Sequence, residues 1–130
     1  MTDPASPRDT PNARNDVDLT IRLTEAPGAP EHTFRLEAGD GGPSAASTLP
    51  DPAAALEAVR LHGEAIFFPK PGPPRLCTQQ YGGPQTAVVT GWYLGREVNS
   101  RFSRTDGCEI ARWRAMAALL GGTAGATGAI

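Results

Sequence analysis

The stretch QTAVVTGWYLGREVNSRF, residues 85–102, decides the fold of this chain. Its first half, residues 85–93, carries β-branched and aromatic side chains and predicts a strand. Leu94-Gly95 indicates a tight turn. Residues 96–104 then alternate between apolar and polar side chains through Val98 and Phe102, which predicts a second strand.

A similar pattern upstream predicts a hairpin from about Val17 to Glu37. Two segments of period-two alternation flank residues 25–30, where Pro and Gly indicate a turn. The apolar members of the alternation are Leu19, Ile21, Leu23, Phe34 and Leu36.

Two helices complete the pattern. Asp51 followed by Pro52 suits an N-cap and first helical position, so we expect a helix from Asp51 to about His62, with Gly63 just past its end. The apolar run at residues 65–68 is interpreted as a short buried strand. A C-terminal helix is expected from Glu109, with apolar residues at helical spacing: Ile110, Trp113, Met116, Ala117 and Leu120.

Strands joined by short connections, together with two helices, predict an antiparallel α+β fold. We expect Trp92 and Trp113 in its core. With 130 residues the chain is predicted to be one domain. Residues 1–16 are expected to be a disordered tail, residues 17–120 the folded domain and residues 121–130 a flexible tail of small residues.

Composition argues against several partners. The net charge of −2 gives no field that would attract nucleic acid or an anionic membrane. No stretch approaches the roughly 20 apolar residues of a membrane span. Residues 1–16 contain no apolar signal-peptide segment. The chain is therefore interpreted either as staying inside the cell or as a mature or mis-started form.

The segment LCTQQYGGP, residues 76–84, is the most informative candidate site. Prolines in the preceding residues 69–75 hold the chain extended, and a cysteine lies inside the segment. Proteases bind substrates as extended strands through backbone hydrogen bonds, so such a segment suits a substrate mimic. An ordinary surface loop is the alternative interpretation.

Cys77 and Cys108 allow one disulfide, which by the chain-entropy estimate would contribute about 3.5 kcal/mol. The alternative is two buried thiols in a reducing compartment. Two cysteines without a C-x-x-C pair are too few for a Cys-rich zinc site. We expect no metal and no cofactor.

Catalytic constellations are absent from the sequence. His32 and His62 have no serine or cysteine motif beside them, so we expect no enzymatic activity. A basic cluster near the end of the chain is interpreted as a solvated face balanced by Asp106 and Glu109. Its members are Arg101, Arg104, Arg112 and Arg114.

Four segments carry a family resemblance. They are CTQQYGGPQTA (77–87), VTGW (89–92), GREV (95–98) and FSRTDGCEIARW (102–113). In order and spacing they resemble the second half of Streptomyces subtilisin inhibitor-like proteins. The first half of the chain matches that family in its layout of strands and helix, so the resemblance covers roughly residues 18–113.

The resemblance implies a five-stranded antiparallel sheet with two helices, usually in a homodimer packed sheet to sheet. It implies an extracellular protein that inhibits subtilisin-like serine proteases reversibly, in the manner of a substrate. The Cys77–Cys108 disulfide is implied as well.

The resemblance also implies a reactive bond between Gln79 and Gln80, with Gln79 as the primary specificity residue. Leu76 and Thr78 would bind the protease on the N-terminal side of that bond, and Tyr81 on the C-terminal side. Leu76 suits a hydrophobic outer pocket.

The chain departs from the family at a second disulfide, whose positions correspond to Leu36 and Ala53. This departure leaves an alternative hypothesis: an intracellular, cytoplasmic binding or scaffold module that keeps the fold without inhibiting. In reducing conditions Cys77 and Cys108 would remain thiols, and the loop would be an ordinary cleavable segment.

Overall fold

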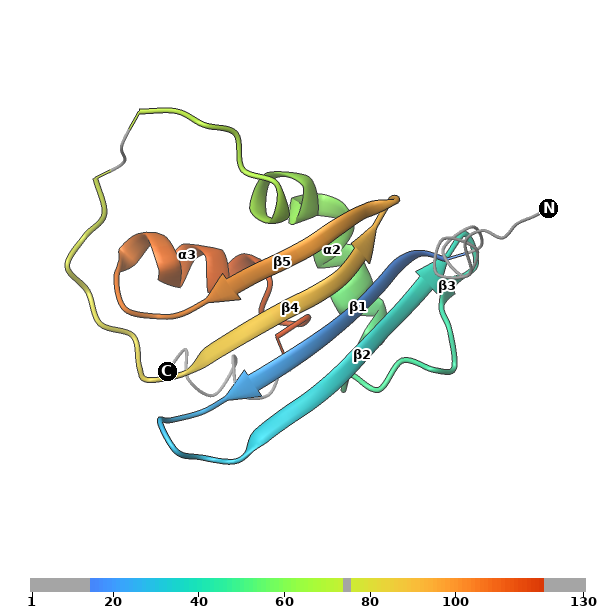
Figure 1. Cartoon of the computed structure of the whole chain (residues 1–130), viewed down its shortest axis with the longest axis horizontal. Helices are drawn as coiled ribbons and strands as arrows, with labels where there is room; N and C mark the ends of the chain where they lie inside the picture. Colours follow the sequence, from blue (N-terminus) through green and yellow to red (C-terminus); the bar gives the residue numbers. More distant parts are fainter. Residues whose placement is uncertain (1–14, 74–75, 121–130) are drawn as a thin grey trace.

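The computed structural model describes residues 15–73 and 76–120, which form an α+β fold with a five-stranded antiparallel sheet (Figure 1). The strands are β1 (Asn15–Thr24), β2 (Glu31–Gly39), β3 (Gly42–Pro43), β4 (Thr86–Tyr93) and β5 (Arg96–Phe102). The two helices of the described residues are α2 (Pro52–Phe67) and α3 (Gly107–Ala115).

The sheet has the order β3-β2-β1-β4-β5, so β1 is central and pairs with β2 on one side and β4 on the other. The two predicted hairpins are confirmed. In the first, Ile21 of β1 faces Phe34 of β2, and in the second, Gly91 of β4 faces Val98 of β5. Residues 94 and 95 form the expected turn, in which both residues have positive φ.

One face of the sheet carries the core. Alternate side chains of β1 are 0–2% exposed, and both helices pack on the same face. Helix α2 contributes Val59 and Phe67, whose ring meets Tyr93 of β4 edge to face at 6.2 Å, while α3 contributes Trp113. The core face of the sheet comprises Val17, Leu19, Ile21, Leu23, Leu36, Ala38, Ala87, Val89, Tyr93, Val98 and Phe102.

Trp113 is buried as predicted, but the prediction for Trp92 is wrong. Trp92 is only half-buried and is not part of the core cluster. Successive strand residues point to opposite faces. Tyr93 and Val89 occupy the core face of β4, so Trp92 lies on the opposite face with Val88.

The predicted end of the first helix is also wrong. Helix α2 continues to Phe67, so Gly63 is inside it and the run at residues 65–68 is its last turn rather than a strand. Gly63 serves packing: a Cβ at this position would come within 3.2 Å of the Tyr93 ring and 3.3 Å of Val59. The start is as predicted, because Asp51 accepts a hydrogen bond from Ala54 N at 3.1 Å.

Helix α3 begins at Gly107, two residues before the predicted start, because Asp106 caps it by accepting from Glu109 N at 2.9 Å. The helix ends at Ala115, and residues 116–120 form turns rather than the expected continuation. Met116, Leu119 and Leu120 are nevertheless buried.

The predicted tail 121–130 and almost all of the predicted tail 1–16 lie outside the described residues. Neither helix α2 nor helix α3, the helices of the described part, has the length and apolar character needed to cross a membrane.

Candidate reactive loop

The predicted protease-binding segment lies between α2 and β4, in the long connection that runs past the outer side of α3 (Figure 1). The described residues between Phe68 and Gln85 form neither helix nor strand, as the prolines predicted. Every residue from Leu76 to Tyr81 is exposed, including two large apolar side chains: Leu76 is fully exposed at 102% and Tyr81 at 69%. The side chains that would face a partner are therefore open to solvent.

A disulfide links the N-terminal part of this segment to α3. Cys77 and Cys108 are bonded, with their Cα atoms 5.2 Å apart. Cys108 lies in the first turn of α3, directly after the helix begins at Gly107. The Leu76 carbonyl oxygen lies 3.9 Å from the Cys108 sulfur, so the chain is close to the helix at this point.

Two backbone hydrogen bonds hold the segment on either side of Gln79 and Gln80. The Thr78 carbonyl oxygen accepts from Gly107 N at 2.9 Å, and Gly82 N donates to the Arg104 carbonyl oxygen at 2.6 Å. Three residues, 79–81, lie between these two points. The side chains of Thr78 and Gln80 approach one another at 3.5 Å across Gln79.

The disulfide and both backbone hydrogen bonds end within residues 104–108, which include most of the connection after β5 and the first two residues of α3. Its position is fixed by the Asp106 cap at its centre and by the core contacts of Phe102 before it and Trp113 after it. The exposed segment is therefore attached to a rigid part of the fold.

Position 107, the first residue of α3, must be glycine because Thr78 of the segment lies directly against it. A Cβ at this position would overlap the Thr78 hydroxyl and approach the Thr78 backbone nitrogen within 3.3 Å. Gly82 is similarly close, because a Cβ there would lie 3.0 Å from the Ile110 side chain. These two glycines allow the segment to lie against the β5–α3 connection.

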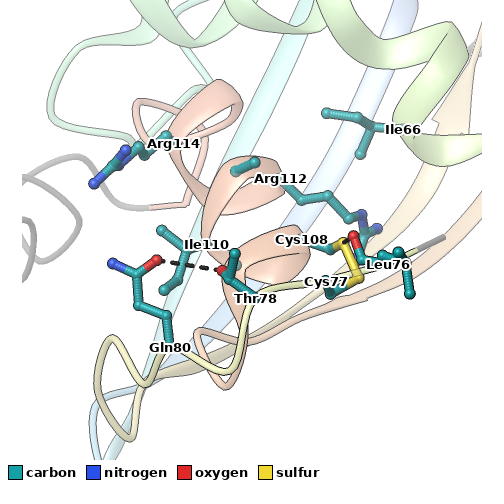
Figure 2. A pocket seen from close by; sticks show the side chains of 11 residues that line it. Ile66, Leu76, Cys77, Thr78, Gln80, Cys108, Ile110, Arg112 and Arg114 are labelled. Atoms are coloured by element: carbon teal, nitrogen blue, oxygen red, sulfur yellow. Dashed lines mark hydrogen bonds between the residues drawn. A yellow bond between two sulfur atoms is a disulfide. The ribbon is translucent and has the colours of Figure 1, made fainter.

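Elsewhere the segment stands away from α3. A recess of about 480 Å³ lies between α3 and the residues Leu76, Cys77, Thr78 and Gln80, and Ile66 of α2 also lines it. Figure 2 shows the side chains around this recess. Arg114 extends away from the disulfide (Figure 2). The segment is thus held at separate points and not by continuous packing.

The four arginines of the predicted basic cluster do not share one environment in the structure. Arg112 pairs with Glu109 at 2.9 Å, which agrees with a balanced, solvated face. Arg104 does not belong to that face, because it is only 5% exposed. Its Nη1 donates to Gln85 Oε1 at 3.4 Å, and its guanidinium lies 6.0 Å from the centre of the Trp113 ring.

The structure brings the predicted site residues together at one edge of the molecule, at the N-terminal end of α3. The sequence did not reveal the residues whose backbone groups hold this segment against the fold, namely Gly82, Arg104 and Gly107. Gly107 was assigned no role from the sequence. Its position one residue before Cys108 was the one available signal that it adjoins the loop.

A scan against models of protein families finds no match to this chain, and a search of curated proteins finds no relative.

Proposed function

We propose that this chain is a serine protease inhibitor that acts on subtilisin-like enzymes, with Gln79–Gln80 as its reactive bond. One observation carries the proposal: Gln79 and Gln80 are exposed between two points, Thr78 and Gly82, that are hydrogen-bonded to the fold. An exposed segment held in this way loses little conformational entropy when an enzyme binds it.

The direction of the hydrogen bonds supports the same proposal. In an extended segment, the backbone groups of successive residues point to opposite sides. The Thr78 carbonyl group faces Gly107 of its own molecule. The backbone groups of Cys77 and Gln79 would then face outward, where a protease can pair with them as it pairs with a substrate.

Inhibition rather than consumption follows from the ties on both sides of the bond. After the protease serine attacks the Gln79 carbonyl carbon, the new amine at Gln80 stays near the acyl group. Gly82 N is hydrogen-bonded to the Arg104 carbonyl oxygen, and Cys77 is joined by the disulfide to Cys108. Both sides of the reactive bond are therefore attached to residues 104–108. The high effective concentration of that amine favours religation over hydrolysis.

The decisive experiment is titration of subtilisin with the oxidised protein, followed by mass spectrometry. We expect stoichiometric inhibition and a small fraction of chain cut between Gln79 and Gln80. Rapid and complete cleavage without inhibition would refute the proposal. That outcome would favour the second candidate, a binding or scaffold module, which is consistent with the recess behind the segment and with the absence of a bridge at Leu36 and Ala53.

Specificity gives a sharper test of the bond itself. Gln79 is uncharged and offers no ion pair to a trypsin-like pocket, so we expect a preference for subtilisin-like enzymes. Gln79→Lys should strengthen inhibition of trypsin by at least about 100-fold, the effect of an ion pair in a desolvated pocket. Gln80→Lys adds the same charge one residue away and is the matched control. Equal trypsin inhibition by the two variants would show that residue 79 does not enter the specificity pocket.

The proposal includes an extracellular homodimer packed sheet to sheet. The face of the sheet opposite the helices carries half-buried side chains that a second copy could cover, among them Thr20 and Thr90, which are paired neighbours at its centre. Thr90→Arg should convert the dimer to a monomer in sedimentation experiments. A wild-type chain that sediments as a monomer at high concentration would refute this part.

A further inference from the structure

The N-terminal end of α3 brings together two cysteine sulfurs and one carboxylate, donor types that Zn²⁺ accepts in proteins. The sulfur atoms of Cys77 and Cys108 and a carboxylate oxygen of Asp106 all lie within 4.8 Å of one another. Sequence reasoning considered only a Cys-rich zinc site and rejected it. It could not foresee that the fold would place Asp106 beside both cysteines.

In the oxidised chain the two sulfurs are bonded to each other and are not available as ligands. A dithiol reductant would convert this disulfide into two thiols while its own two thiols become a disulfide. Cys77 is exposed, so a reductant can reach it. Rotation about the Cα–Cβ bond of either cysteine can then separate the two sulfurs.

Asp106 can act as the third ligand and keep its role in the helix. It is the N-cap of α3, and Cys108 lies in the first turn of the same helix. Capping uses Oδ1 of Asp106, which accepts from Glu109 N at 2.9 Å. A carboxylate has two oxygens and several lone pairs, so Asp106 can cap the helix and bind a cation at the same time.

We propose that the reduced chain binds one divalent cation of the zinc class through Cys77, Cys108 and Asp106. Two thiol protons leave as the two metal–sulfur bonds form, so one cation replaces two protons, and water fills the fourth position of a tetrahedral site. The cation re-forms the connection between residues 77 and 108 that reduction breaks. The site does not depend on the proposed inhibitory function, because it needs only the fold and reduced cysteines.

The test uses the full chain, reduced, freed of reductant without oxygen and titrated with Cd²⁺ alone. We expect a sulfur-to-metal charge-transfer absorption that saturates at one Cd²⁺ per chain, with release of two protons. The oxidised chain should show neither signal. A reduced chain that binds no more Cd²⁺ than the double variant Cys77→Ser, Cys108→Ser would overturn the proposal.

Asp106→Asn tests the third ligand, because asparagine keeps the helix cap but removes the anionic oxygen. We expect Cd²⁺ affinity to fall by about tenfold or more. Glu109→Gln is the matched control, since it removes a carboxylate from the same helix turn without touching the three ligands, and it should bind like the wild type. Wild-type affinity in Asp106→Asn would refute the role of Asp106.

Reduction of the disulfide could unfold the chain, and circular dichroism detects whether it does. The test with Cd²⁺ then still applies. In that case Cd²⁺ should restore the spectrum of the oxidised protein, because the three ligands come together only in the folded chain. Binding of Cd²⁺ without recovery of the spectrum would overturn the proposal.

Discussion

Strand β1 and the segment Leu76–Tyr81 are both non-helical, but the fold holds them in place by different interactions. From Val17 to Thr24, β1 pairs on both sides with neighbouring strands, and its alternate side chains are almost completely buried. Residues 76–81 are all exposed and are held by one disulfide and two backbone hydrogen bonds.

The difference shows what makes a peptide segment available to a partner. A strand paired on both sides has no backbone groups left to offer, whereas an unpaired segment can bind another protein along its edge. Burial stabilises the first region, while the second depends on a few separate attachments. Changes in the first should therefore lower global stability, and changes in the second should mainly alter the behaviour of the loop.

The largest loss of stability is expected for Gly91→Ala in β4. Gly91 has φ +133°, and a Cβ there would overlap the Asp18 carbonyl oxygen of β1. Backbone strain and this clash together should lower the free energy of unfolding by about 4 kcal/mol, measured by urea denaturation. Gly41→Ala is the control, because its Cβ would meet nothing within 4 Å. Equal midpoints for the two variants would contradict the tight β1–β4 approach.

Removing the disulfide should have the next largest effect. The double variant Cys77→Ala, Cys108→Ala should lose about 3.5 kcal/mol, since the bridge joins residues 31 apart and restricts the unfolded chain. Near 78–82, cleavage by a protease should become faster than in the wild type while the protein is still folded. A variant cut no faster would show that the two backbone hydrogen bonds hold the loop alone.

Helix capping allows the same change to be made beside the loop, at α3, and away from it, at α2. Asp51→Ala and Asp106→Ala each remove an N-cap acceptor and should each cost about 1 kcal/mol by thermal denaturation. Only the change at Asp106 should also accelerate cleavage of the loop, because Gly107 and Cys108 follow it directly. Asp106→Asn, which keeps the cap, should behave like the wild type in stability. Equally fast loop cleavage in Asp51→Ala would show that the loop responds to global stability and not to its own attachments.

The smallest change in stability is expected at Leu76. Because its side chain is completely exposed, Leu76→Ala should shift the free energy of unfolding by less than about 0.5 kcal/mol. Inhibition of subtilisin should nevertheless weaken by about tenfold if the side chain enters a hydrophobic pocket. Leu61→Ala, at an exposed leucine on α2, should change neither quantity. A clear stability loss at Leu76 would mean that the loop packs on the fold.

The sheet could be predicted because its signal is local. Period-two alternation fixes which residues of β1, β2 and β5 share a face, and turn residues fix the hairpins. The end of α2 could not be predicted, because Gly63 resembles a helix terminator. Its real role is to let the helix approach Tyr93, a contact between positions far apart in the sequence.

The candidate site follows the same division. Its exposed residues were predicted from local pattern and resemblance, since prolines and a cysteine mark the segment. The residues that hold this segment could not be predicted, because the backbone hydrogen bonds from Gly107 to Thr78 and from Gly82 to Arg104 join parts of the chain that are distant in the sequence. Arg104 was placed on a solvated face for the same reason: nothing near it in the sequence indicates that Gln85 and Trp113 would enclose it.

The disulfide gives the chain a covalent topology that no hydrogen bond could give. Residues 77–108 and the two bonded sulfurs form a closed ring, and every peptide bond between the two cysteines lies within it. One cut in the ring, at Gln79–Gln80 or elsewhere, adds a water molecule and leaves a single molecule. Without reductant, cut and intact chains would migrate on a gel as one species. With reductant, the cut chain would separate into residues 1–79 and 80–130. The number of pieces after one cut is therefore set by the redox state and not by the protease.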